Sequence, residues 1–228
     1  MKHEQLSFVV ARWLARHIVI PLLVRMQVRG LEHVPRSGAF IAAANHSSML
    51  DIPLMMALLP RRPSIMGRRD LWEKPLLPLM LNWGDAVPVN RGGADRAALR
   101  AADDKLSKGI PFGIFPEGTR TRTGALGSAK AGVGMIALRA KVPVVPIAFI
   151  GTQNILRGRR LHFFPRPRVA MIIGPPIEPE ELAQAGRPDA AAELIMRRIA
   201  ALLPAEARGI YADLATAGST SGQEDVNV

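Results

Sequence analysis

Short apolar runs alternate with helical patterns of apolar and polar residues from Gly30 onward. The runs are bounded by polar or glycine-containing segments, which is typical of short buried strands. Such strands are predicted near residues 39–44, 64–66, 86–89, 111–115, 144–150 and 169–173. Helical spacing predicts helices near residues 52–59, 71–81, 94–107, 129–140 and 193–203.

The segments between these strands are long enough for crossover connections. This order predicts an α/β fold with a mixed, largely parallel sheet flanked by helices. Ligands of such sheets collect at the carboxyl ends of the strands. The segments that begin at Asn45, Asn90 and Pro116 each follow a predicted strand, so we expect three polar loops at one edge of the sheet.

The first residues form an amphipathic pattern. Arg12, Arg16 and Arg25 interrupt the apolar runs and no small-residue cleavage site follows, which argues against a spanning helix and a signal peptide. An apolar stripe with arginines beside it favours a helix lying in an anionic membrane interface, while packing on its own domain is the alternative. The stripe consists of Leu6, Val10, Trp13, Leu14, His17 and Ile18.

The domain organisation follows from these patterns and from the length of 228 residues, which suits one domain. We expect an N-terminal amphipathic membrane-associating helix over residues 1–29 and one α/β domain over residues 30–215. Residues 216–228 are rich in Ser, Thr, Gly and acids and are expected to be a disordered tail.

The composition of the chain limits the partners and the reaction types that it can support. The chain carries a formal charge of +11 and a mean hydropathy of +0.12, which favours anionic partners such as phospholipid headgroups, phosphorylated substrates or nucleic acid. It contains no cysteine. Disulfides, thiolate metal sites and cysteine nucleophiles are therefore excluded.

The segment NHSSMLD, residues 45–51, holds a histidine and a carboxylate five positions apart. In a continuous helix this spacing places side chains about 140° apart. His46 and Asp51 meet only if the histidine lies in a loop and Asp51 begins the helix, which Pro53 favours. An imidazole that donates to a carboxylate is an oriented general base. The alternative is a helix cap, by Ser48 or Asp51, beside a loop histidine.

Two further polar segments carry arginine. In FPEGTR, residues 115–120, Gly118 permits a positive φ, Thr119 and Arg120 offer donors to an oxyanion, and Glu117 can orient a substrate or pair with an arginine. Arg91 lies beside two glycines and suits a phosphate ligand. Taken singly, each segment is more typical of an ordinary surface turn than of a binding site.

The ordered set of NHSSMLD, residues 84–91, FPEGTR and VPVVPI (residues 142–147) resembles the four motifs of the glycerolipid acyltransferases, over roughly residues 30–176. The resemblance implies transfer of a fatty acyl group from a thioester of coenzyme A or acyl carrier protein to lysophosphatidate, giving phosphatidate. In that family, the positions matched by His46 and Asp51 are the catalytic histidine and its orienting aspartate. The matched positions associated with the acceptor's phosphate are Arg91, Glu117, Gly118, Thr119 and Arg120.

We therefore expect direct acyl transfer with His46 as general base and Asp51 holding its ring. The covalent alternative would use Ser47 or Ser48, but no G-x-S-x-G sequence is present. No metal or other cofactor is expected, because a thioester is already activated. The expected partners are a lysophospholipid acceptor, acyl-CoA or acyl carrier protein, and an anionic membrane surface, with the chain peripheral or monotopic on its cytoplasmic face.

Two other functions fit part of the sequence. The same fold can act on another lysolipid or on glycerol 3-phosphate. A nucleic-acid or anionic-surface binding module is suggested by RGRRLHFFPRPR, residues 157–168, which has five arginines, two phenylalanines and no acid. Such a module does not need the four ordered motifs, so no nucleic acid is expected.

Overall fold

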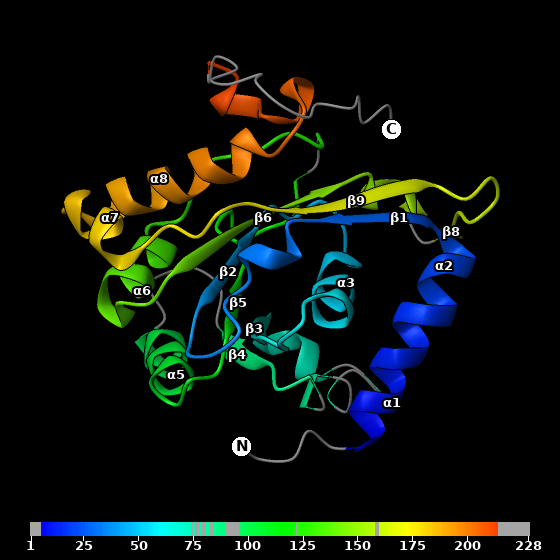
Figure 1. The fold of residues 1–228 in the computed structure, drawn as a ribbon, viewed down its shortest axis with the longest axis horizontal. Helices are drawn as coiled ribbons and strands as arrows, with labels where there is room; N and C mark the ends of the chain where they lie inside the picture. The colour runs from blue at the N-terminus through cyan, green and yellow to red at the C-terminus, as the bar shows by residue number, and fades with distance from the viewer. Residues whose placement is uncertain are drawn as a thin grey trace.

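The computed structural model describes residues 6–73, 75, 78, 81–82, 84–89, 96–121, 123–157 and 160–213. Its centre is a seven-stranded sheet with the order β1-β9-β6-β2-β5-β3-β4 (Figure 1). A small second sheet pairs β7 (Leu156–Arg157) with β8 (Arg160–Leu161). The strands of the main sheet are β1 (Arg25–Arg29), β2 (Ile41–Ala44), β3 (Ser64–Arg68), β4 (Val87–Val89), β5 (Phe112–Ile114), β6 (Val144–Ile150) and β9 (Arg168–Ile173).

The direction of the strands decides where the loops gather. β6, β2, β5, β3 and β4 are mutually parallel, while β9 runs antiparallel to β6 and β1 runs parallel to β9. The predicted mixed, largely parallel sheet is confirmed. The carboxyl ends of β2, β4 and β5 therefore lie at one edge of the sheet, as expected for the three polar loops.

Helices cover both faces of the sheet. In Figure 1, α6 and α8 lie on one side, and α3 with the N-terminal helix lies on the other. The predicted helices near residues 52–59, 94–107, 129–140 and 193–203 are confirmed, whereas the described start of the helix expected at residues 71–81 is a 3₁₀ turn, η3 (Arg69–Glu73). The helices of the domain whose bounds the structure describes are α3 (Asp51–Leu58), α5 (Arg96–Ser107), α6 (Ala131–Ala140), α7 (Pro179–Gln184) and α8 (Pro188–Ala201).

The core forms two layers because the central strands are buried on both faces. In β2, Ile41 and Ala43 pack in the layer that contains α6 and α8, while Ala42 and Ala44 pack in the layer that contains α3. All four are fully buried. A strand covered on both sides is apolar at every position, which explains its continuous rather than alternating pattern.

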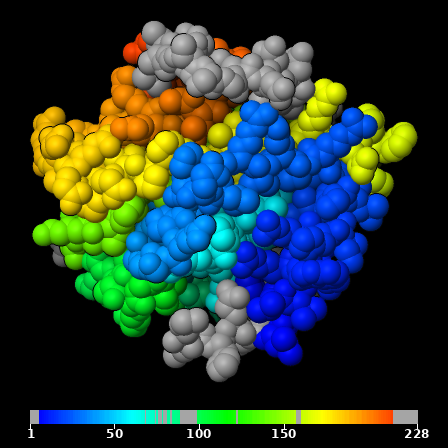
Figure 2. Space-filling view, in the orientation of Figure 1, coloured from blue at the N-terminus to red at the C-terminus, as the bar shows by residue number. Residues whose placement is uncertain are grey.

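The N-terminal helix runs without a break through α1 (Leu6–Leu14), a π-helical turn, η1 (Ala15–Val19), and α2 (Ile20–Leu23). By length and composition alone, Leu6–Leu23 is long and apolar enough to cross a membrane. One side packs on the domain: Phe8 and Ile20 are buried, and the Arg12 guanidinium donates to the carbonyls of Ala57 and Leu59. The helix forms a ridge on one side of the molecule, coloured blue in Figure 2.

The opposite side of this helix is an exposed apolar stripe, so the helix packs on its own domain through one side while the predicted stripe stays uncovered by the described residues. The expected extent of the N-terminal element, residues 1–29, is also corrected. The helix ends at Leu23, Val24 is extended, and Arg25–Arg29 joins the sheet as edge strand β1. The exposed apolar residues of the helix are Leu6, Val9, Val10, Trp13, Leu14, Ile18, Val19 and Leu22.

The strand β1 shows the alternation that its burial requires. Met26 and Val28 are partly buried against the layer that contains α3, whereas Arg25 and Gln27 are exposed. Such alternation is typical of a strand at a sheet edge. The expected tail, residues 216–228, lies outside the described residues.

Candidate active site

The loop after β2 is held by Asn45. Its side-chain amide donates to the Phe149 carbonyl at 2.9 Å, and its carbonyl oxygen accepts from the Phe149 N–H at 2.7 Å. Asn45 is itself buried. Two hydrogen bonds to the neighbouring strand β6 therefore fix the direction in which the chain leaves β2, and this places His46 at the carboxyl edge of the sheet.

His46 and Asp51 meet as the loop geometry requires. His46 Nδ1 lies 2.8 Å from Asp51 Oδ2. Asp51 is the first residue of α3, and the residue that caps the helix is Leu50, without a side-chain cap bond. The carboxylate points back to the loop instead, because Oδ2 also accepts from the N–H groups of Ser47 and Ser48, both at 2.7 Å. The helix-cap alternative is therefore wrong for Asp51.

The burial of this pair differs between its two partners. Asp51 is completely buried, while the His46 side chain keeps 14% of its surface exposed. Asp51 Oδ1 has no hydrogen-bond partner within the described part of the chain. All the donors that face this carboxylate in the described structure thus converge on one oxygen, which orients the imidazole through Nδ1 and leaves Nε2 without a hydrogen bond to the described residues.

Phe115 is a site residue that the sequence analysis did not single out. Its ring stacks on the His46 ring, with the centroids 4.2 Å apart and the planes inclined by 26°. Phe115 directly follows β5, the neighbour of β2. The only signal in the sequence was its place at the end of the predicted strand 111–115, directly before the polar segment that begins at Pro116. With Asp51 on one nitrogen and Phe115 on one face, the imidazole is restrained in two directions.

Glu117 supports the histidine through the backbone. One carboxylate oxygen accepts from the His46 N–H and the other from the Gly127 N–H, both at 3.1 Å. Burial raises the pKa of Glu117, and these two N–H groups and the nearby His46 oppose the rise in pKa. We expected substrate contact or an arginine partner for this residue. Its carboxylate instead connects the loop that holds His46 to the segment that holds Gly127.

The turn after Glu117 is open to solvent. Gly118 has a φ of +67°, and Gly118, Thr119 and Arg120 are exposed. The next residue, Thr121, donates its N–H to the His46 carbonyl at 2.8 Å. The turn is thus attached directly to the histidine loop and carries the exposed Arg120. Arg91 lies outside the described residues.

A cavity of about 490 Å³ lies elsewhere. It is bounded by the N-terminal helix and by segments that precede β2 and β3, with Arg16, Val34, Leu58 and Arg61 among its lining residues. These segments lie at the amino-terminal edge of the parallel strands. This cavity is therefore separate from His46.

The comparison with known families decides the assignment. Residues 25–150, more than half of the chain, match the sequence model of the family described as Acyltransferase. The chain belongs to this family. The matched residues include both the His46–Asp51 pair and the turn at Gly118.

Two relatives of the chain carry the same enzyme name. The chain is 28% identical over 176 residues to 1-acyl-sn-glycerol-3-phosphate acyltransferase alpha of Mus musculus, covering 76% of this chain and 62% of that protein. It is 29% identical over 170 residues to the 1-acyl-sn-glycerol-3-phosphate acyltransferase of Bacillus subtilis, covering 74% and 82%. The chain thus spans about three fifths of the length of its mammalian relative.

A solved structure shares the fold. The crystal structure of the 1-acyl-sn-glycerophosphate (LPA) acyltransferase PlsC from Thermotoga maritima is similar with a TM-score of 0.71 and 27% sequence identity. The match covers 89% of this chain and 83% of that one. The likeness therefore extends over nearly the whole described architecture and beyond the family match.

Proposed function

We propose that this chain is an O-acyltransferase that moves a fatty acyl group from acyl-CoA or acyl carrier protein to the free sn-2 hydroxyl of lysophosphatidate. The product is phosphatidate, a precursor in phospholipid biosynthesis. The observation that carries the proposal is the His46–Asp51 pair, joined at 2.8 Å at the carboxyl edge of the sheet in a member of the acyltransferase family. The names of its relatives support lysophosphatidate as the acceptor.

His46 is the general base in this mechanism. Nε2 takes the proton of the acceptor hydroxyl while the oxygen attacks the thioester carbonyl carbon. The new C–O bond forms, the C–S bond breaks, and the imidazolium returns the proton to the departing thiolate. Two observations support this role: Nδ1 is engaged with Asp51, and Nε2 makes no hydrogen bond to the described residues. A positioned base of this kind contributes ~10²- to 10⁴-fold in rate.

Direct transfer is favoured over a covalent acyl-enzyme by the two neighbouring serines. Ser47 Oγ accepts from the Asn45 amide and Ser48 Oγ accepts from the Leu50 N–H, both at 3.3 Å. Within the described chain neither hydroxyl is hydrogen-bonded to His46. An activated serine nucleophile requires a base within hydrogen-bond reach.

The acceptor's phosphate is proposed to bind at the exposed turn of Gly118, Thr119 and Arg120. Its support is the hydrogen bond from the Thr121 N–H to the His46 backbone carbonyl, which attaches the turn to the histidine loop. A guanidinium can bind two phosphate oxygens at once. Arg91 is proposed as a second ligand on the resemblance alone. Glu117 is proposed to hold the turn in place, because its carboxylate is occupied by two backbone N–H groups.

The reaction is proposed to take place on a membrane and to need no metal or prosthetic group. A thioester is already activated, and acyl-CoA or acyl carrier protein serves as co-substrate. The exposed stripe of the helix Leu6–Leu23 supports membrane association. We propose a peripheral or monotopic position on the cytoplasmic face, with an anionic surface attracting a chain of charge +11.

The test is an acylation assay with purified protein. Acyl-CoA or acyl carrier protein is supplied with lysophosphatidate, other lysolipids or glycerol 3-phosphate, and products are identified by mass spectrometry. We expect phosphatidate from lysophosphatidate. If this acceptor were ignored while another was acylated, the proposed acceptor would be wrong.

The general base is tested by His46→Ala, which we expect to lose ~10²- to 10⁴-fold in kcat/KM. His33→Ala is the matched control, because the His33 ring bonds to the Ile173 carbonyl, which lies at the edge of the sheet opposite to His46. The control is expected to keep its turnover. A His46→Ala variant with wild-type turnover would refute the proposed role.

A further inference from the structure

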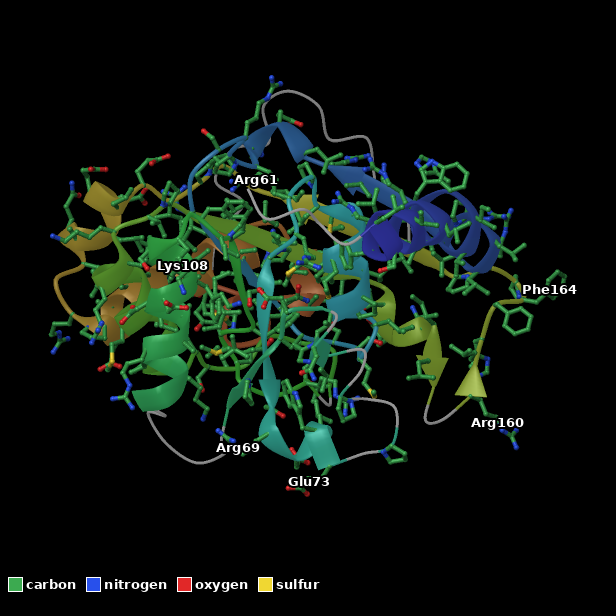
Figure 3. All side chains as sticks on the ribbon, turned by 90° about the horizontal axis from the view of Figure 1, so that it is seen from below. Arg61, Arg69, Glu73, Lys108, Arg160 and Phe164 are labelled. Carbon is green, nitrogen blue, oxygen red and sulfur yellow. The ribbon has the colours of Figure 1, made fainter. Side chains whose placement is uncertain are left out.

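The segment Arg160–Arg168 carries apolar side chains that nothing in the described structure covers. Phe164 is 91% exposed, and Leu161 and Phe163 are each 55% exposed. Every described residue from Arg160 to Arg166 is exposed. Figure 3 shows Phe164 at the outer tip of the segment, pointing away from the body of the protein. Clustered aromatic surface of this kind marks an interaction site.

The segment leaves the sheet at the edge that holds His46. It connects β6 to β9, and the carboxyl end of β6 lies next to that of β2 because the two strands are parallel, with Ala44 opposite Ile147. β9 is antiparallel to β6, so Arg168 begins β9 at this same edge. The exposed phenylalanines and the candidate general base therefore share one edge of the sheet.

The same segment is attached to the end of the N-terminal helix. The Arg166 guanidinium donates to the Pro21 carbonyl at 3.0 Å, and the Arg25 N–H donates to the Pro167 carbonyl at 2.9 Å. Figures 1 and 2 show α2 and the β8–β9 segment side by side. Leu22 is 69% exposed on this end of the helix. Two apolar surfaces, distant in sequence, thus adjoin at one end of the molecule.

Exposed arginines make this end of the molecule, where the Arg160–Arg168 segment adjoins the end of the N-terminal helix, positively charged. Arg25, Arg160, Arg166 and Arg168 are exposed there. The sequence has no Asp or Glu between residues 5 and 31, nor between residues 118 and 177. Aromatic side chains beside arginines, without acids, suit insertion at the boundary between acyl chains and anionic headgroups.

We propose that Leu161, Phe163 and Phe164 form a second membrane contact, which enters the same leaflet of an anionic bilayer as the exposed stripe of the N-terminal helix. Arg160 and Arg166 lie at the level of the lipid phosphates. Contact through two separate segments fixes the orientation of the domain, with the His46 edge against the lipid. In this orientation a lysolipid could pass from the bilayer to His46, and this use of the contact rests on the proposed function. The membrane contact itself does not depend on the proposed function.

The first experiment uses the absence of cysteine from the chain. A Phe164→Cys variant is labelled with a nitrobenzoxadiazole fluorophore and mixed with phosphatidylglycerol vesicles that carry a spin label on their acyl chains. We expect a blue shift and quenching by the spin label. The matched control is Lys108→Cys, which precedes β5 at the opposite edge of the sheet (Figure 3) and is expected to show neither effect.

Pure phosphatidylcholine vesicles give the charge dependence, and we expect a weaker response there. If the label at position 164 stayed in water while the protein sedimented with the vesicles, the second contact would be refuted. A response to a single-stranded oligonucleotide but not to vesicles would also refute it, and would identify a nucleic-acid surface.

The second experiment measures function at this surface. Phe163→Ser combined with Phe164→Ser is expected to lower partition onto anionic vesicles by roughly tenfold, from the apolar surface removed. Acylation of lysophosphatidate embedded in vesicles should fall with it, while acylation in detergent micelles stays at the wild-type level. An unchanged partition contradicts the inference. A wild-type protein that binds vesicles but acylates no lysolipid contradicts the proposed function instead.

Discussion

The Asp51 carboxylate accepts hydrogen bonds from the described residues through only one of its two oxygens. Oδ2 accepts from the His46 ring and from two backbone N–H groups, while Oδ1 faces no partner in the described part of the chain. The same atom therefore shapes the loop and orients the imidazole. A substitution that keeps this oxygen and removes the charge separates the two roles.

Asp51→Asn is that substitution. Its carbonyl oxygen can replace Oδ2, so the loop is kept, but the amide is left buried without an acceptor at a cost of ~1–3 kcal/mol in the free energy of unfolding. Loss of the charge that stabilises the imidazolium should lower kcat/KM by ~10²- to 10⁴-fold. Both are measured, by denaturant unfolding and by the acylation assay.

The control for Asp51→Asn is the double variant with His46→Ala. If the two residues act as one unit, the double variant is no slower than His46→Ala alone. Multiplied losses would show that Asp51 acts independently of the imidazole.

Glu117 gives a pH dependence of stability. Burial raises its pKa in the folded protein above the ordinary value of 4.5, so folding favours the protonated form. Its stabilising contribution is present below pH 4.5 and is lost as the pH rises through the folded-state pKa. The free energy of unfolding of the wild type should therefore decline relative to Glu117→Gln as the pH rises through this range.

Denaturant unfolding at several pH values measures this difference. The exposed Glu206 provides the matched control for the charge change, as Glu206→Gln. A difference between wild type and Glu117→Gln that grows in favour of the wild type with rising pH contradicts the expected sign.

At the scale of elements, the site depends on loops tied across neighbouring strands and on helices packed closely behind them. α6 meets the start of α8 at Gly134, where an added Cβ would lie 1.9 Å from the Pro188 carbonyl oxygen. Gly132, in the same helix, has open space at that position. Substitutions at Gly134 and Gly132 therefore separate two effects on stability: the close packing of two helices and the low helix propensity of glycine.

Gly134→Ala should lower the free energy of unfolding by ~1–3 kcal/mol or more, because the two helices must separate. Gly132→Ala should raise it by ~0.5–1 kcal/mol, because alanine is the better helix former. Denaturant unfolding of the two variants measures both effects. Shifts of the same sign would mean that packing of α6 on α8 is not what selects glycine.

At the scale of the whole molecule, the N-terminal helix has two different sides. Phe8 is buried against the domain, whereas Trp13 is 55% exposed in the apolar stripe. The first side belongs to the fold and the second to the proposed membrane surface. Substitution of Trp13 should therefore affect membrane binding, and substitution of Phe8 should affect the stability of the fold.

Trp13→Ala should weaken vesicle binding and leave the free energy of unfolding within about 0.5 kcal/mol of the wild type. Phe8→Ala should cost ~3–5 kcal/mol in stability. Vesicle sedimentation and denaturant unfolding check the two effects. Undiminished vesicle binding by Trp13→Ala would remove the stripe from the membrane contact.

Much of the fold could be predicted from the chain. The central strands are short and wholly apolar, the helices have helical periodicity, and the parallel crossovers follow from the lengths between them. These signals are local. Edge strand β1 was missed because its five residues follow a long apolar helix and pair only with β9, far along the chain.

The sequence by itself determined which residues stand at the carboxyl ends of the strands, among them His46 and the Gly118 turn, because the strands follow from local patterns and their parallel direction follows from the lengths of the crossovers between them. Only the tertiary structure decided how they are held. Glu117 bonds to the backbone of a residue 71 positions away, and Asn45 to one 104 positions away. Phe115 stacks on a ring from another loop. Local periodicity carries no information on such contacts, since they exist only once the sheet has brought the loops together.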